Sequence, residues 1–281
     1  MWIDTHAHLD AAELDAGRAA MLERAARAGV GCVVVPAVEP ANFAAVRELA
    51  HAHGHAYALG VHPLYVARLR REDLRLLREE LRLRAADPRL VAVGEIGLDH
   101  FAEQDPAGRA EQAWWLDAQL ELAAEFALPV LLHVRRAQDA VAAALRRRAW
   151  GAQGRGGIAH AFNGSEQQAR AFLAQGLCLG FGGTLSFERS RNIRRLAKGL
   201  PEQALVLETD APDMAPQWIT HGPEPRPNEP AELPRIGAVL AGLRGWTPQH
   251  TATLTAANAL RVLPRLAALL AGSGAAASAR A

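Results

Sequence analysis

Short apolar runs recur along the whole chain, and a longer segment with helical spacing of its apolar positions follows each of them. The runs predict eight strands, at Trp2–Asp4, Cys32–Pro36, Tyr57–Val61, Leu90–Ile96, Val130–Val134, Gly157–Phe162, Leu177–Gly182 and Leu205–Glu208. The periodic segments predict helices near Gly17–Ala28, Ala41–Ala52, Glu72–Ala85, Ala110–Phe126, Gln138–Arg147, Glu166–Ala174, Arg189–Lys198 and Leu233–Leu243.

Regular alternation of strands and helices favours parallel strands joined by right-handed crossovers. Eight such units in 281 residues predict an α/β fold, a single-domain (β/α)8 TIM barrel. A doubly wound open sheet is the alternative, but no Gly-x-Gly-x-x-Gly motif follows the first strand. We expect the barrel to cover residues 1–271 and the segment 272–281 to be a disordered tail.

Ionisable side chains stand at the ends of five predicted strands, where they are costly unless they pair or bind an ion. His6 and His8 follow the first strand at i, i+2 spacing, which places both imidazoles on one face of an extended chain. The later strand ends carry Glu95, His133, His160 and Asp210. Because parallel barrel strands all end at one face, we expect these six side chains to converge on a metal site.

The chemistry of this donor set indicates a catalytic metal site. Four imidazoles with two carboxylates suit Zn, Mn, Co or Ni better than Ca, and they accommodate Mg when waters complete its shell. An open, mixed set of this kind differs from a closed, Cys-rich structural site. The hypothesis of a non-catalytic scaffold stabilised by metal is therefore disfavoured.

Composition and charge narrow the picture further. Half of the residues are hydrophobic, which lets a chain of this length bury a large core. The formal net charge is +1, so no overall basic excess points to nucleic acid, although a local basic patch is compatible with it. Cys32 and Cys178 lie inside apolar runs and are predicted to be buried free thiols. We expect a cytoplasmic protein with no signal peptide, no membrane segment and no obligate protein partner.

Several segments in order along the chain carry a resemblance to a known family. They are Asp4-Thr5-His6-Ala7-His8-Leu9-Asp10, Gly60-Val61-His62-Pro63, Gly94-Glu95-Ile96-Gly97-Leu98-Asp99, Leu128-Pro129-Val130 with His133 and Arg135, His160-Ala161-Phe162, Glu208-Thr209-Asp210-Ala211-Pro212 and Asn228-Glu229-Pro230. Together they resemble the TatD family of metal-dependent deoxyribonucleases, over Met1 to Leu263. The resemblance implies a TIM-barrel hydrolase that binds two or three divalent ions, with Mg, Mn or Zn as candidates.

The resemblance also implies how the ligands divide. One ion would be held by His6, His8, Glu95 and Asp210. The second would be held by Glu95, His133 and His160, with Glu95 bridging the two. Two departures from the family pattern, His100 and Asn163, fall at the expected rim of the pocket and bear on substrate preference.

Three further residues are expected to act on the substrate. Asp210 is the best candidate to accept the proton of a metal-activated water, because a ligating carboxylate touches that water. His62 ends the third strand, and Arg135 shares a strand face with His133, so both are expected to contact a phosphate. Arg136 is expected to point the opposite way, into solvent.

The motif set favours a deoxyribonuclease that cleaves phosphodiester bonds from a DNA end, single-stranded or frayed. Glu95 also stands where a lysine would be needed for a carbamylated metal bridge, which favours the same hypothesis. The alternative is a hydrolase of the same fold that acts on another ester, a lactone, a phosphotriester or an aminoacyl ester. It stays open because the metal ligands activate water without specifying the bond that is cleaved.

Overall fold

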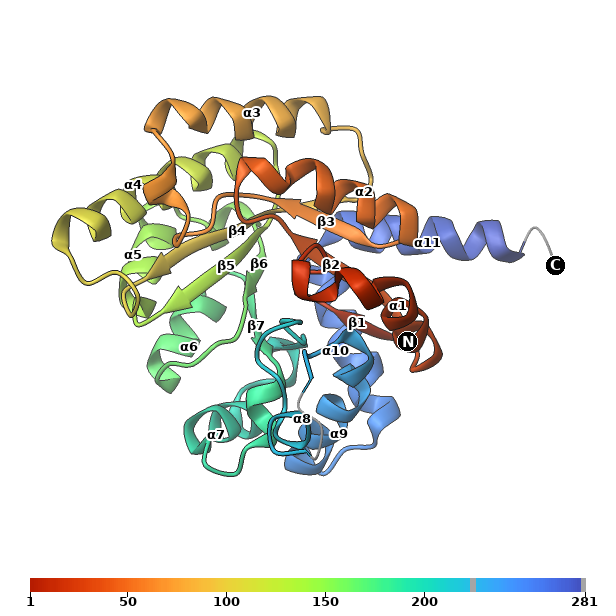
Figure 1. Cartoon of the computed structure of the whole chain (residues 1–281). Helices are drawn as coiled ribbons and strands as arrows, with labels where there is room; N and C mark the ends of the chain where they lie inside the picture. The colour runs from red at the N-terminus through yellow and green to blue at the C-terminus, as the bar shows by residue number, and fades with distance from the viewer. Residues whose placement is uncertain (223–225, 279–281) are drawn as a thin grey trace.

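The computed structural model describes residues 1–222 and 226–278, and it has the predicted (β/α)8 architecture (Figure 1). Its strands are β1 Trp2–Asp4, β2 Val30–Pro36, β3 Ala56–Leu59, β4 Leu90–Asp99, β5 Val130–Arg135, β6 Gly157–Ala159, β7 Leu177–Phe181 and β8 Leu205–Leu207. Each strand pairs in parallel with the next one along the chain, in the order β1 to β8. All eight predicted strands are confirmed.

Helices surround the sheet in the described part of the chain (Figure 1). They are α1 Arg18–Arg27, α2 Phe43–His53, α3 Leu74–Leu83, α4 Pro106–Glu125, α5 Gln138–Arg147, α6 Glu166–Leu173, α7 Arg191–Gly199, α8 Gln217–Thr220, α9 Leu233–Arg244, α10 Pro248–Val262 and α11 Pro264–Ser278. The eight predicted helices correspond to α1 to α7 and α9. The strand–helix alternation predicted from apolar spacing is therefore correct throughout the barrel.

The last two helices were not predicted. A start signal for α10 is nevertheless present, because the Thr247 hydroxyl accepts a hydrogen bond from the His250 amide and Pro248 occupies the first turn. Helix α11 continues through Ser278, where the sequence predicts a disordered tail from Gly272 onward. This segment is rich in alanine, which has a high helix propensity, and that propensity leaves no trace in the spacing of apolar positions.

The core has two layers on either side of the strands. One layer lies between the strands and the surrounding helices. In the other, strand residues such as Leu131 and Ile158 fill the barrel and pack against Leu263 and Leu266, at the junction of α10 and α11. Arg265 donates to the carbonyl oxygen of Leu90, at the start of β4. The two helices thus close the amino end of the barrel. Both cysteines belong to this inner layer and are free and buried, as predicted.

Within the described residues, no single helix is long and apolar enough to cross a membrane, although α10 and the start of α11 satisfy the criteria as a pair bent by 115°.

Hydrogen bonds between β8 and β1 close the barrel at the end where the candidate ligands stand. The Thr5 amide donates to the carbonyl oxygen of Leu207 at 3.1 Å, and the Asp210 amide donates to that of His6 at 2.9 Å. Beneath them, the Thr209 hydroxyl donates to the Asp4 carboxylate at 2.6 Å. We call these hydrogen bonds the β1–β8 seam. They hold the motif that begins at Asp4 beside the motif that begins at Glu208.

The proline-rich segment that follows β8 is tied back onto the barrel. The Asn228 side-chain amide donates to the carbonyl oxygens of Thr209 and Asp213, at 2.8 and 2.9 Å. The Glu229 carboxylate binds Arg24 of α1 through two guanidinium nitrogens. Asn228 and Glu229 thus anchor the segment, whose residues 223–225 lie outside the described part of the chain.

Replacing Gly97 with alanine should separate β4 from β5. Gly97 has φ +151°, and a β-carbon there would overlap the carbonyl oxygen of His133. We expect Gly97→Ala to lower the free energy of unfolding by at least about 3 kcal/mol, because overpacking and backbone strain add. Urea denaturation measures it. As a matched control, Gly242→Ala fills open space in α9 and should stabilise by about 0.5–1 kcal/mol. A wild-type midpoint for Gly97→Ala would contradict the packing.

Candidate metal centre

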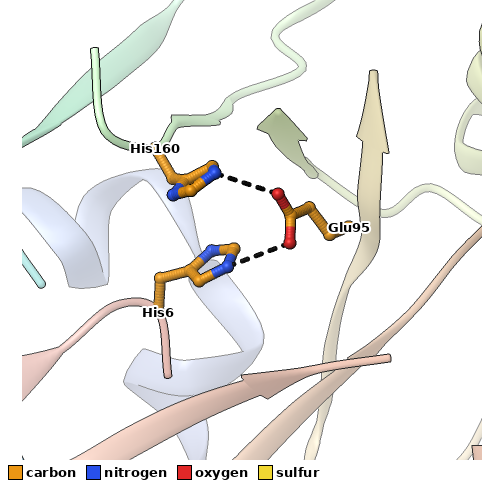
Figure 2. Close-up of side chains that lie close together, drawn as sticks. All are labelled: His6, Glu95 and His160. Atoms are coloured by element: carbon orange, nitrogen blue, oxygen red, sulfur yellow. Dashed lines mark ion pairs between the residues drawn. The ribbon is translucent and has the colours of Figure 1, made fainter. Parts of the chain in front are cut away.

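The six side chains predicted as ligands converge at the carboxyl ends of the strands, around the carboxylate of Glu95. Glu95 lies in β4 and is 1% exposed. Figure 2 shows His6 and His160 one above the other on the same side of Glu95, each directed at one of its two oxygens. His6 Nε2 lies 3.1 Å from Oε2, and His160 Nε2 lies 2.9 Å from Oε1. The two oxygens of one carboxylate thus face two adjoining clusters of nitrogen atoms, which meet where the His6 and His160 rings stack 4.0 Å apart.

The first cluster surrounds Oε2 of Glu95. His8 Nε2 lies 3.4 Å from this oxygen and 3.3 Å from His6 Nε2. Asp210 Oδ1 lies 3.6 Å from each of these two imidazole nitrogens. The donor atoms of His6, His8 and Asp210 therefore lie close enough together to hold one ion, and both imidazole nitrogens are within 3.4 Å of Glu95 Oε2.

The second cluster surrounds Oε1 of Glu95. His133 Nδ1 and His62 Nε2 lie 3.1 and 3.4 Å from this oxygen. His160 Nε2 lies 3.4 Å from His133 Nδ1. His62 and His160 lie just beyond β3 and β6, whereas Glu95 and His133 lie within β4 and β5.

Hydrogen bonds on the far side of each ring distinguish His133 from His62. His133 Nε2 lies 3.0 Å from Asp99 Oδ2, so it donates there and leaves the Nδ1 lone pair facing Glu95. Burial opposes ionisation of Asp99, but the bond from His133 lowers the pKa of that carboxyl to about 2. His62 Nδ1 instead accepts the Leu64 amide proton at 3.1 Å, which places its own proton on Nε2. His133 thus presents an Nδ1 lone pair that can bind a metal ion, whereas His62 presents an Nε2–H that can donate a hydrogen bond.

The electrostatics of the centre favour positive charge. Burial opposes ionisation of Glu95, but the imidazoles of His160 and His6 hold its pKa well below the usual value. Burial alone would lower the pKa of each histidine, yet Glu95 raises that of His8 to about 9 and that of His160 to about 10. Protons and cations therefore compete for the same buried negative charge.

The donor atoms fit divalent ions. Oε2 of Glu95 is buried and accepts no hydrogen bond from any described residue. The imidazole nitrogens of His6 and His8, like those of His133 and His160, lie close enough in pairs for their lone pairs to share one cation. A mixed nitrogen and oxygen set matches the preferences of Zn and Mn, and also of Mg with added waters.

Two further buried carboxylates support the ligands, and sequence reasoning missed both roles. Asp4 Oδ1 accepts the backbone amide protons of His6 and Thr209, at 3.2 and 3.0 Å. Glu208 Oε1 accepts that of Ala161 at 2.5 Å, and burial raises the pKa of this carboxyl to about 8. Their adjacency to the ligands in the Asp-Thr-His and Glu-Thr-Asp motifs was the available signal.

A pocket of about 1060 Å³ opens above the centre. It is lined by five of the six predicted ligands, all except the fully buried His6, together with His62, Arg135 and Arg136. Arg135, predicted to bind phosphate, lies at the rim with its side chain 54% exposed. Its Nη1 is 3.9 Å from Asp99 Oδ2, and its guanidinium lies 4.0 Å from the centre of the Phe101 ring. The pocket thus joins the metal ligands to a basic rim.

The prediction that Arg136 points away from the site is wrong. Arg136 lines the pocket and lies 4.6 Å from the Phe101 ring centre. Its φ of +54° is left-handed, one residue beyond the end of β5, so the alternation of strand side chains no longer applies. Of the two family departures, Asn163 lines the pocket and accepts a hydrogen bond from Asn192, whereas His100 is half-buried beside Phe101.

Comparisons with known proteins agree with this geometry. The family model described as "TatD related DNase" matches residues 3–264. The metal-dependent hydrolase YjjV of Escherichia coli K12 is 43% identical over 244 residues, 86% of this chain and 90% of the relative. The 3'-5' ssDNA/RNA exonuclease TatD of a Rahnella species is 33% identical over 258 residues, covering 91% and 95%.

A solved structure extends the likeness to the fold. The crystal structure of the E. coli TatD homologue YjjV superposes with a TM-score of 0.85 at 40% identity, over 94% of this chain and 98% of that chain. The family model spans nearly the whole barrel, and the structure brings its motifs together around one carboxylate. The chain therefore belongs to the TatD family of metal-dependent hydrolases.

Proposed function

We propose that this protein hydrolyses phosphodiester bonds at the end of single-stranded DNA, with divalent ions held around Glu95. One observation carries the proposal: each oxygen of the Glu95 carboxylate faces its own cluster of imidazole nitrogens, as a carboxylate bridging two ions would. Two-metal sites of this kind are typical of phosphodiester hydrolysis. Relatives of 33 to 35% identity named 3'-5' ssDNA/RNA exonucleases support a nucleic-acid terminus as substrate.

The two clusters define the ligands that we propose. His6, His8 and Asp210 would hold one ion with Oε2 of Glu95. A second ion would be held by His133 and His160 with Oε1. Bound divalent ions lower the pKa of a water from about 15.7 towards 7 and neutralise charge on the phosphate. Mg, Mn and Zn all suit these donors.

Asp210 is the proposed general base. It follows β8, and its Oδ1 lies 3.6 Å from His6 Nε2 and from His8 Nε2, where a water at the first cluster would sit. The carboxylate is 8% exposed and lines the pocket, so it faces both the ligands and the substrate. It would take the proton from the water as the oxygen attacks phosphorus.

His62 and Arg135 are the proposed phosphate contacts. The Leu64 amide fixes the tautomer of His62, so Nε2–H points into the pocket 3.4 Å from Glu95 and can donate to a phosphate oxygen. The Arg135 guanidinium lies at the rim, where it can present two parallel donors to the same phosphodiester. These contacts orient the bond that is cleaved relative to Asp210.

Asp210→Asn keeps the size of the side chain but removes the proton acceptor. We expect kcat to fall by about 100- to 10,000-fold, the usual contribution of a general base. Circular dichroism melting should show the same fold and a melting temperature close to that of the wild type. Retention of wild-type turnover would remove the assignment of Asp210 as the base.

Ion counting tests the division of ligands. After chelation and reloading with Mn, elemental analysis should show one ion fewer for His8→Ala and for His160→Ala, and loss of both for Glu95→Gln. The reason is that Glu95 serves both clusters, whereas each histidine serves one. His51→Ala, on α2, is the control and should retain the full complement. Full metal content in Glu95→Gln would contradict a bridging role.

Labelled DNA tests the substrate. With Mg or Mn, a linear single-stranded oligonucleotide should give a ladder of products, and a covalently closed single-stranded circle should stay intact. Chelator should stop the reaction, and labels at either end report its polarity. Asp210→Asn protein purified in parallel controls for contaminating nuclease. Activity confined to nitrophenyl esters, lactones or phosphotriesters would overturn the nuclease proposal in favour of another hydrolase of this fold.

A further inference from the structure

Three side chains form an aromatic and cationic cluster at the pocket rim between β4 and β5. Phe101 lies just after β4 and is 41% exposed, and Arg135 and Arg136 lie at the end of β5. The two guanidinium groups lie 4.0 and 4.6 Å from the centre of the Phe101 ring. All three residues line the pocket that contains the metal ligands. We call Phe101, Arg135 and Arg136 the rim cluster.

The positive charge of the rim cluster is largely unpaired. Many arginines of the chain sit against a carboxylate, as Arg71 does with Glu111 at 2.8 Å. The carboxylate recorded near Arg135 is that of Asp99, at 3.9 Å, and it already accepts the proton of His133. Arg136 forms no ion pair with any residue in the described ranges 1–222 and 226–278. Arg136 therefore faces the pocket without an anionic partner among the described residues, and Arg135 shares the Asp99 carboxylate with His133.

The rim cluster is held rigidly against the metal centre. Asp99 Oδ2 orients His133, and Oδ1 of the same carboxylate accepts the amide protons of Phe101 and Ala102, at 3.0 and 2.8 Å. One buried side chain thus fixes both a candidate ligand and the turn that presents the aromatic ring. This hydrogen-bonding network thus links the backbone that carries Phe101 to a candidate metal ligand.

An exposed ring beside one unpaired and one weakly paired guanidinium group is suited to single-stranded nucleic acid. Proteins bind such strands by stacking bases on aromatic rings and guanidinium planes, while arginines contact the phosphates. The metal ligands act only on the bond that is cleaved. At about 1060 Å³, however, the pocket reaches the upper end of the volumes that enclose a drug-sized ligand, and it extends to the rim.

We propose that the rim cluster is a subsite for the nucleotide next to the phosphodiester that is cleaved. Arg136 and Arg135 bind its phosphate, and the layer formed by Phe101 and the guanidinium groups stacks its base. Cation–π contact with Phe101 keeps the arginines in place before the strand arrives, which lowers the entropy cost of binding. The inference rests on the proposed nuclease function and adds to it a subsite, the rim cluster, that selects flexible, unpaired strands.

Binding in the Asp210→Asn background tests the subsite without turnover. Fluorescence anisotropy with a labelled single-stranded hexanucleotide, in Mn and at several salt concentrations, gives Kd and its salt dependence. Adding Arg136→Ala should reduce the slope of log Kd against log salt by about 0.7, the value for one single-strand phosphate contact. Adding Phe101→Ala should weaken binding by about tenfold. Phe101→Trp should restore affinity, and Phe101→Leu should not.

A matched control separates this role from a general effect of losing an arginine. Arg155 lies over the Trp150 ring at 5.3 Å, just before β6 and hence at the opposite end of the barrel. Arg155→Ala should leave both Kd and the salt slope as in the parent. Equal effects of Arg136→Ala and Arg155→Ala, or an unchanged salt slope for Arg136→Ala, would overturn the subsite.

Kinetics distinguish failure of the subsite from failure of the proposed function. In the otherwise wild-type enzyme, Phe101→Ala and Arg136→Ala should lower kcat/KM for a single-stranded decanucleotide about tenfold more than for bis(p-nitrophenyl) phosphate. The small diester has no neighbouring nucleotide to bind. If the wild type cleaves neither substrate, the nuclease proposal fails. If it cleaves both and each variant loses equally on the two, the subsite alone fails.

Discussion

The structure depends on one buried carboxylate. Glu95 is ionised in an apolar barrel, and a charge there is stable only if positive charge surrounds it. The chain meets this requirement with four histidines, each near or just beyond the carboxyl end of another strand: β1, β3, β5 or β6. Their imidazoles approach both oxygens of Glu95. Asp99 and the β1–β8 seam then hold the rings in place. The imidazoles that balance the charge of Glu95 are thus also the candidate metal ligands and substrate contacts.

Much of the barrel was predictable because its strands and helices obey simple periodicities. The converging positions of His6, His133 and His160 followed from strand ends alone, since parallel strands all finish on one face. Arg136 was misplaced because a single left-handed residue after β5 reverses the direction expected from alternation. No local pattern announces such a turn. The role of Asp99 depends on its contact with a ring 34 positions away, which periodicity does not encode.

Helices α10 and α11 illustrate a second limit of sequence patterns. Residues of both helices pack against the barrel interior and the amino ends of strands, and α10 also packs against α9, β1 and β8. They follow α9 with no strand between them, so they do not belong to the repeating strand–helix unit. Motifs identify candidate ligands, and apolar periodicity predicts the strands and helices of the barrel, but neither predicts which residues close its amino end. Leu263 and Leu266 do so by packing against residues contributed by many strands.

That closure leaves the pocket above Glu95 accessible from the carboxyl ends of the strands and blocked from the amino ends. A nucleic-acid strand that entered between the loops at the carboxyl ends would meet the packed interior beneath Glu95 and could not pass through the barrel. Under the proposed nuclease function, a released nucleotide would leave through the same carboxyl-end face by which the nucleic acid enters, so product release and advance of the substrate would alternate.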